Sequence, residues 1–423
     1  MSHEHTEFGR GLAYRIPCCP SDILRSMQFD SFFQNYRGSA FSVRTLDGWS
    51  WNSSEHLRPR LIATFRANHF LDAVIGSTSD AALGRTFLDG DLDIQGDICI
   101  LLAVAQYILS HSEGLNRNLI RAIGRFCFDL HRRLKPATRA AEHRNWHCCP
   151  CPVDLPSHFF ESWLGPQLGH ACAVLMGPES DFRAAQAAGL QRACASLDLD
   201  RGEHLLDLGC GWGALLLHAA EAYGAEVQGI ASSDSQAQVA ADRICDRGLQ
   251  RYATVECRDI RAHPFSAGSF DKISDIGVFE QVRSVDLASY LACIRQMLAP
   301  QGLLTLHRMT RSRNAAGSAL CSLCPDLVLE PLAHDLQVAE AAGLEIVRLE
   351  SLDREYEFTL RTWIDHLRTN WTNGTACGND EVLLERGRRA WLLYLVELTT
   401  YLESRELQVH GITLRRASTS KLD

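Results

Sequence analysis

A glycine-rich turn constrains this chain more than any other segment. Residues 205–213 read LLDLGCGWG, where an apolar strand carries Asp207 and three alternate glycines follow, namely Gly209, Gly211 and Gly213. Glycine lets the backbone approach a ligand closely, and the amino end of the next helix offers unpaired N–H groups. Dinucleotide enzymes use a G-x-G-x-x-G turn, whereas G-x-G-x-G with an acidic residue two positions earlier suits S-adenosylmethionine. The segment therefore predicts an S-adenosylmethionine site, and a strand–helix turn without a ligand is the alternative.

Short apolar runs alternate with helical segments from Arg201 onward. The predicted strands read HLLDLG, AEVQGI, ATVECRD, FDKISDI and GLLTLHRM. This alternation predicts an α/β fold with a parallel sheet and helices on both faces. Near the end, a predicted helix over 388–402 precedes the strand-like run ELQVHGITLRR (406–416), which we expect to return to an edge of the sheet.

The front of the chain differs from this pattern. A length of 423 residues exceeds one typical domain. Apolar spacing predicts helices over 61–75 and 98–110, and an alternating stretch surrounds Trp49–Trp51. A polar connector rich in proline and cysteine follows at 140–157. We therefore expect a smaller α+β domain over 1–140 and the α/β domain over 141–423.

The net charge and the cysteine content limit which binding partners and which cellular compartment we expect. The formal net charge of −9 argues against general nucleic-acid binding. The first residues lack the apolar core of an export signal, and the most apolar run, 98–109, is about half of the ~20 residues that span a bilayer. Sixteen cysteines are scattered through apolar segments, so free thiols in a cytoplasmic protein are expected. No metal is expected in the cluster 143–151 or at Cys321 and Cys324, because adjacent cysteines cannot easily reach one ion.

Two positions after later predicted strands complete the expected cofactor site. Asp259 follows the run TVEC and would accept a hydrogen bond from the adenine amino group at the carboxyl edge of the sheet. A solvated turn residue is the alternative. Methyltransferases usually carry an acidic residue after the second strand to hold the ribose hydroxyls. Here Asp234 comes a little late for that role, and Gln236 would substitute for it.

Many ordered segments resemble the cyclopropane-fatty-acid synthase family of methyltransferases. They are VDLPSHFFESWL (153–164), HACAVL (170–175), LLDLGCGWG, GIASSDSQ (229–236), GVFEQV (277–282), LLTLHRMT (303–310), REYEFTLRTWIDHL (354–367), RRAWLLYL (388–395) and ELQVHGITLRR. The run ALGRTFLDGDLDIQGD (82–97) resembles the family's amino-terminal lipid-binding segment. The resemblance, which extends to mycolic-acid cyclopropane synthases, implies a Rossmann-like class I methyltransferase with a parallel-rich seven-stranded sheet.

The resemblance also implies a mechanism. An isolated alkene is a weak nucleophile, so it must lie against the sulfonium methyl group in a dry pocket. Methyl transfer leaves a carbocation, and closing the ring requires a base, for which the family implies a bound bicarbonate. By motif, Glu280, His307 and Tyr356 hold this anion together with backbone groups at Cys172 and Met309. Taken singly, Glu280 could be a helix cap, His307 a core histidine and Tyr356 a packing residue.

Four segments depart from the family's usual pattern. Residues 151–154 read CPVD instead of His-His-Tyr-Asp, and His170–Cys172 replaces Tyr-Ser-Cys. Gln281 stands where a histidine is usual, and residues 319–325 read ALCSLCP without the expected tyrosine and arginine. By the resemblance, these changes surround the acceptor and the amino-acid end of the cofactor. We therefore expect them to affect which substrate is bound more than how the base is held.

The function predicted is transfer of a methylene or methyl group to the double bond of an unsaturated phospholipid acyl chain, which forms a cyclopropane. The enzymatic alternatives are a methyl- or methylene-forming fatty acid methyltransferase and a C- or N-methyltransferase of a secondary metabolite. An inactive lipid-binding homologue is the non-enzymatic alternative. Because no run spans the bilayer that holds the acceptor, we expect peripheral membrane contact through the front domain and the basic stretch 121–139. A homodimer is left open.

Overall fold

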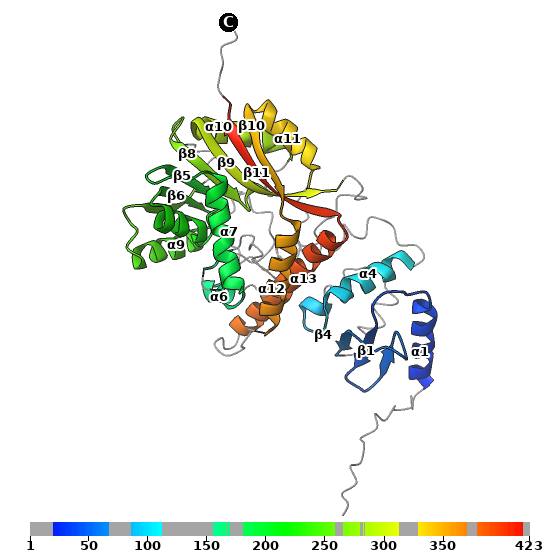
Figure 1. Ribbon diagram of the computed structural model, residues 1–423. Coiled ribbons are helices and arrows are strands. Elements are labelled where there is room, and N and C mark those ends of the chain that lie inside the picture. The colour runs from blue at the N-terminus through cyan, green and yellow to red at the C-terminus, as the bar shows by residue number, and fades with distance from the viewer. Residues whose placement is uncertain are drawn as a thin grey trace, which may run out of the picture. The chain divides into compact units, whose positions relative to one another are not determined.

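The computed structural model describes residues 20–66, 86–111, 155–165, 167–169, 181–258, 265–279, 282, 284–312, 329–369 and 379–417. The chain divides into two units, of which the first holds residues 1–78 with 85–115 and the second holds 79–84 with 116–423 (Figure 1). The boundary expected at residue 140 lies outside the described residues. None of the described helices is long and apolar enough to cross a membrane.

The first unit is a small α+β structure. Its sheet has the order β2-β1-β3-β4. Its elements are α1 (Pro20–Phe33), β1 (Phe41–Thr45), β2 (Ser50–Asn52), β3 (Leu61–Phe65), β4 (Leu92–Gly96) and α4 (Cys99–His111). Phe29 and Phe33 of α1 pack against Trp51, whose indole nitrogen donates a hydrogen bond to Asp30 at 2.8 Å. This aromatic core joins the helix to the sheet.

The helix predicted over 61–75 was wrong at its start, and residues 67–75 lie outside the described part of the chain. Residues 61–65 form strand β3, which pairs in parallel with β1 and antiparallel with β4. Burial alternates along it, since Leu61, Ala63 and Phe65 are buried while the two residues between them are half-buried. A run of five residues is too short for its apolar spacing to distinguish the period of a strand from that of a helix. Pairing with strands on both sides stabilises the segment as a strand. The helix expected over 98–110 is confirmed as α4.

The second unit contains a seven-stranded sheet of order β10-β11-β9-β8-β5-β6-β7 (Figure 1). The strands are β5 (His204–Leu208), β6 (Glu226–Ala231), β7 (Ala253–Cys257), β8 (Phe270–Ile276), β9 (Leu298–Arg311), β10 (Leu344–Ser351) and β11 (Leu407–Arg416). The five strands from β9 to β7 are parallel, and β11 runs antiparallel to both of its neighbours. This arrangement confirms the predicted fold class.

Helices cover both faces of this sheet. The helices and helical turns of this unit are α6 (Ser157–Leu164), α7 (Phe182–Ser196), α8 (Ala214–His218) with a π turn at Ala219–Tyr223, α9 (Asp234–Asp246), a 3₁₀ turn at Ser284–Asp286, α10 (Leu287–Met297), α11 (Leu332–Ala341), α12 (Asp353–Thr369) and α13 (Asn379–Glu403). Leu205 and Leu303 pack with α7 and α8, whereas Leu206 and Leu304 pack with α10 and α11. Because side chains alternate along a strand, Asp207 and His307 belong to the α7 face.

The carboxyl-terminal strand lies inside the sheet and not at its edge. β11 lies between β9 and β10, and β10 takes the edge. The prediction of a strand over 406–416 is confirmed, but its edge position was wrong because β10 had not been anticipated. The sequence of β10, LEIVRLES, is largely exposed and mixes charged with apolar residues, so it lacks the pattern of a buried strand.

Candidate active site

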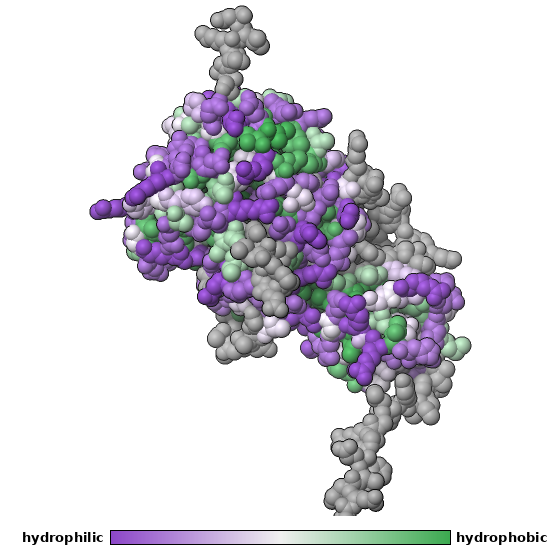
Figure 2. Space-filling model, in the orientation of Figure 1, coloured by the Kyte–Doolittle hydropathy of each residue, from purple (hydrophilic) through white to green (hydrophobic). Residues whose placement is uncertain are grey.

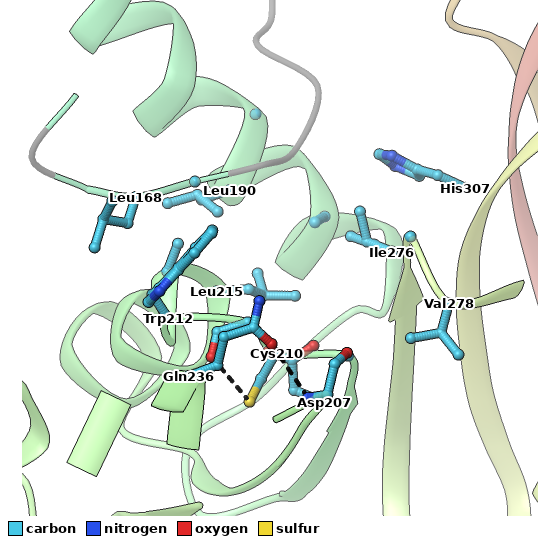
Figure 3. Close-up of a pocket in the computed structure, with 18 residues that line it drawn as sticks. Leu168, Leu190, Asp207, Cys210, Trp212, Leu215, Gln236, Ile276, Val278 and His307 are labelled. Carbon is cyan, nitrogen blue, oxygen red and sulfur yellow. Dashed lines mark hydrogen bonds between the residues drawn. The ribbon is translucent and has the colours of Figure 1, made fainter. Parts of the chain in front are cut away.

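A pocket lies at the carboxyl ends of the parallel strands, where α/β folds bind ligands. Its wall combines the turn after β5 with the ends of β6, β8 and β9 and with one side of α7. The lining residues are Leu168, Gly169, Gly189, Leu190, Ala193, Asp207, Gly209, Cys210, Gly211, Trp212, Ala214, Leu215, Ser232, Gln236, Ile276, Gly277, Val278 and His307. Figure 3 shows Asp207, Trp212 and Gln236 on one side of this space and His307 on the other.

The three predicted glycines have different roles in the turn. All have positive φ angles, of 71° at Gly209, 54° at Gly211 and 84° at Gly213. A Cβ on Gly209 would lie 2.1 Å from the side chain of Val278, whereas a Cβ on Gly211 would meet nothing within 4 Å. Gly213 does not line the pocket and forms the N-cap of α8. Gly211 is therefore the position where the backbone faces the open space of the pocket.

Asp207 brings a buried carboxylate to the pocket wall. Its side chain is 3% exposed, and Oδ1 accepts a hydrogen bond of 2.6 Å from Ser274 on the neighbouring strand. Oδ2 is buried and accepts no hydrogen bond from the described residues. Burial raises the pKa of Asp207 to about 7, which the nearby carboxylate of Asp275 reinforces and the Ser274 hydrogen bond opposes. Such a carboxyl group can ionise when a cation binds beside it.

Gln236 combines a capping role with a place in the pocket. The Ser233 hydroxyl caps α9 by accepting a hydrogen bond of 3.2 Å from the backbone N–H of Gln236. The Gln236 Oε1 atom accepts from the Ser232 N–H at 3.3 Å. Its Nε2 atom makes no hydrogen bond with the described residues, so it remains a donor for a ligand in the pocket. Asp234, the alternative residue, is exposed and does not line the pocket.

His307 lies on β9 across the pocket from the glycine turn. Its Nδ1 atom is buried and has no hydrogen-bond partner among the described residues. Burial lowers the pKa of His307 to about 4; the carboxylate of Glu350 acts against this shift and Arg192 adds to it. The imidazole is therefore neutral near pH 7, and one of its nitrogens carries a hydrogen that it can donate.

Tyr356 is placed near the end of β9 by the first turn of α12. Its backbone N–H donates to Leu352, and Leu352 lies against Gly411, which pairs with His307 across the sheet. The Tyr356 side chain is buried but does not line the pocket. Arg192 of α7 bonds to Glu355, the residue before Tyr356, at 3.2 Å, and so ties α12 to the pocket helix.

Three predicted site residues lie outside the described part of the chain, namely Asp259, Glu280 and Cys172. The departures at 151–154, 170–172, 281 and 319–324 lie outside it too, and so do the cysteine cluster and the basic stretch 121–139. Within the described residues, no group of three His, Cys, Asp or Glu side chains could hold a metal ion.

Ser274, which donates a hydrogen bond to Asp207, was not among the predicted site residues. The signal for it is indirect, because Ser274 sits opposite Asp207 only once β5 and β8 are known to be paired neighbours. Trp212 and Ile276, whose apolar side chains line the pocket, were not predicted either. Trp212 stands inside the glycine motif, so its place could have been read from the motif itself.

Ligand binding at Asp207 is expected to depend on pH. With a pKa of about 7, Asp207 is mostly protonated near pH 6, and a cationic ligand must displace that proton. We expect S-adenosylmethionine, which carries ammonium and sulfonium charges, to bind about tenfold more tightly at pH 8 than at pH 6. Calorimetry on wild-type protein and Asp207→Asn measures this, since the variant has no carboxyl group to titrate. An equal pH dependence in both proteins would rule out the role of Asp207.

The chain is similar in sequence to several known proteins. A family model described as mycolic acid cyclopropane synthetase matches residues 141–412. A probable fatty acid methyltransferase of Pseudomonas putida is 29% identical over 343 residues, which cover 78% of this chain and 81% of that protein. The cyclopropane-fatty-acyl-phospholipid synthase of Escherichia coli K12 is 25% identical over 313 residues, covering 71% and 73% respectively.

Solved structures show the same fold. The mycolic acid cyclopropane synthase CmaA1, crystallised with SAH and CTAB, matches with a TM-score of 0.57 and 23% identity. The match covers 67% of this chain and 99% of that one. Other neighbours at similar TM-scores include an N-methyltransferase, so the fold is shared by enzymes with different acceptors.

Proposed function

We propose, from the premise that the chain belongs to the mycolic acid cyclopropane synthetase family, that it transfers a one-carbon group to the double bond of an unsaturated acyl chain. The chain is an S-adenosylmethionine-dependent methyltransferase of this family. The acceptor we propose is the acyl chain of a phospholipid, and the product is a cyclopropane ring.

The polar groups of the pocket and the open space at Gly211 support S-adenosylmethionine as its ligand. The unpaired Oδ2 of Asp207 can accept a hydrogen bond from the cofactor's ammonium group, and the Nε2 of Gln236 can donate to the ribose oxygens. Gly211 leaves room for the ligand against the backbone, and by motif Asp259 would accept from the adenine amino group. When bound, the cofactor supplies an electrophilic methyl group.

The proposed reaction has two bond-forming steps. The electron pair of the acyl double bond forms a new bond to the methyl carbon while the sulfur–methyl bond breaks, which leaves a positive charge on the acyl chain. A proton then leaves the new methyl group, and its C–H electron pair forms the second carbon–carbon bond of the ring. Apolar walls such as Leu168, Leu190 and Ile276 exclude water that would otherwise trap the cation.

His307 fits a role in holding the base better than a role as the base. With a pKa of about 4 it is a poor proton acceptor near neutral pH. A neutral imidazole with a buried, unpaired Nδ1 can instead donate a hydrogen bond to an anion. We propose that bicarbonate, which would supply the base, is held by His307 together with Glu280, Tyr356 and the backbone of Cys172.

One observation carries this proposal. His307, a polar residue with an unpaired buried nitrogen, opens onto the same pocket as the glycine turn after β5. A simple methyl transfer to oxygen or nitrogen would not need a separate anion site beside the cofactor. This nitrogen supports the proposal that the base is held beside the methyl donor.

A second outcome keeps the same acceptor. The Pseudomonas putida relative is named a probable fatty acid methyltransferase, while the Escherichia coli relative is named a cyclopropane synthase. Gln281 and the segment 319–325 depart from the family pattern at positions that the resemblance assigns to the surroundings of the acceptor and the cofactor. If these changes redirect the proton loss, the product is a methyl-branched or methylene-bearing chain.

Lipid analysis of a bacterial host that expresses the chain tests the proposal. Mass spectrometry should find unsaturated acyl chains that have gained the mass of one CH₂ group, and hydrogenation should not add hydrogen at the modified position. A gain of mass with unsaturation retained supports the second outcome. Unchanged lipids, in a host that produces folded protein able to bind S-adenosylmethionine, would contradict both.

Membrane contact is expected to be peripheral and electrostatic. Met27, Leu46 and Leu57 of the first unit are exposed, but Leu46 and Leu57 follow opposite ends of the sheet, so they form no single apolar patch. Figure 2 likewise shows apolar residues of this unit scattered among hydrophilic ones. We therefore propose that the basic stretch 121–139 supplies the attraction to anionic lipid.

The charge reversals Arg132→Glu and Arg133→Glu test this contact when combined in one variant. At about 1 kcal/mol for each basic residue near the lipid surface, the pair should lower affinity for anionic vesicles by at least about tenfold. Arg251→Glu, an exposed turn position in the second unit, is the control and should have no effect. Equal sedimentation of all three proteins with vesicles would show that the basic stretch does not dock.

A further inference from the structure

Strand β10 is an edge of the seven-stranded sheet and carries exposed apolar side chains. Within the described residues it pairs with β11 alone. Ile346, Val347 and Leu349 are 37%, 43% and 44% exposed. Figure 2 shows apolar residues gathered on the surface where Figure 1 places β10 and α11. Because an edge strand presents unpaired backbone groups, an apolar one is a template for pairing with a further strand.

The two faces of β10 differ in polarity. Ile346 and Leu349 pair with Leu414 and Ile412 of β11, which belong to the core under α10 and α11. Directly paired residues point to the same face of a sheet, so Ile346 and Leu349 lie on this side. The register shifts after Ile346, which leaves Val347 as the extra residue of a β-bulge. The bulge therefore keeps both apolar side chains on one face.

Two charges of opposite sign lie on the other face of β10. Glu345 and Arg348 pair with Arg415 and Thr413 of β11, which alternate with the core residues of that strand. Neither the Glu345 nor the Arg348 side chain forms an ion pair or a hydrogen bond within the part of the chain that the structure describes. Charges on an edge strand usually repel a second copy, whereas two opposite charges on one face can attract it.

We propose that β10 pairs in antiparallel orientation with β10 of a second copy of this chain, about a two-fold axis at Ile346. With Val347 kept as a bulge, Glu345 and Arg348 lie one position from this axis on either side. The Glu345 of each copy then lies opposite Arg348 of the other copy, which gives two ion pairs. A two-fold interface requires such a self-complementary patch.

The same register also brings apolar side chains together. Rotation about an axis normal to the sheet keeps each face on its own side, so the two Ile346 side chains meet on the face of α10 and α11. Leu349 lies opposite Leu344 of the other copy on the same face, and the backbone groups of both edges gain partners. No residue of β10 lines the pocket, so this interface does not depend on the proposed function.

Charge reversal tests the interface, by sedimentation velocity of the full chain over a range of concentrations. Glu345→Arg and Arg348→Glu each place like charges opposite one another at two positions. We expect each variant to raise the dissociation constant of the dimer at least about tenfold. In Glu345→Arg/Arg348→Glu opposite charges face each other again, so the dissociation constant should return to within about threefold of the wild-type value.

Two further variants complete the test. Arg251→Glu changes the net charge as Arg348→Glu does, at an exposed turn, and should leave the dimer unchanged. Ile346→Lys places two positive charges at the axis and should give a monomer. A wild-type chain that is monomeric at every concentration would overturn the proposal, and so would a dimer that neither single reversal nor Ile346→Lys weakens. A double variant as weak as the single ones would overturn the register.

Discussion

Replacement of His307 by alanine is expected to lower the rate of product formation by about two to three orders of magnitude. His307 contributes a hydrogen-bond donor in a buried site, and removal of one such donor from a reacting anion typically costs that much. The residue lies on the far side of the pocket from Asp207 and Gln236 (Figure 3). Affinity for S-adenosylmethionine should therefore change by no more than about threefold.

Two amides serve as matched controls for this substitution. His307→Asn places a donor near the position of Nδ1, whereas His307→Gln places it near that of Nε2. Because Nδ1 is the buried atom without a partner, we expect His307→Asn to retain more activity than His307→Gln. Steady-state kinetics with calorimetry of cofactor binding measures both effects. Full activity in the alanine variant would remove His307 from the mechanism.

Replacement of Gly211 by valine should weaken S-adenosylmethionine binding by about 100-fold or more. The valine side chain would occupy the open space next to the Gly211 backbone, which we expect the ligand to fill. Valine at a φ of 54° also costs about 1–2 kcal/mol of backbone strain. Gly209 would be a poorer test, because its Cβ would collide with Val278 and disturb the fold.

Gly248 offers a control that separates ligand exclusion from strain. It has a φ of 68° in the turn between α9 and β7, and its Cβ would also meet nothing within 4 Å. Gly248→Val and Gly211→Val should therefore lose similar thermal stability, but only the latter should lose the cofactor. If Gly211→Val bound S-adenosylmethionine as tightly as Gly248→Val does, the turn would not be the binding site.

The sequence predicted the central strands well because their signals are local. The strands β5 to β9 each contain a short apolar run, helices follow β5, β6 and β8, and the glycine motif marks the end of β5. Edge and small-domain strands carry weaker signals. Leu61–Phe65 is too short to show its period, and β10 is mostly exposed, so neither could be assigned from spacing alone.

The site was predictable only where one motif carries both the chemistry and the position. Asp207 and Gly211 fall within such a motif, and Gln236 follows the next strand. The contact of Ser274 with Asp207 could not be predicted, because it depends on the register between β5 and β8.

Transfer of a labelled methyl group tests the central proposal most directly. Purified protein is incubated with vesicles of an unsaturated phospholipid and with S-adenosylmethionine whose methyl group carries three deuterium atoms. The mass of the modified acyl chain is then measured by mass spectrometry. Ring closure by proton loss from the new methyl group predicts a saturated cyclopropane that retains two of the three deuterium atoms. A product that retains all three would contradict ring closure at this site.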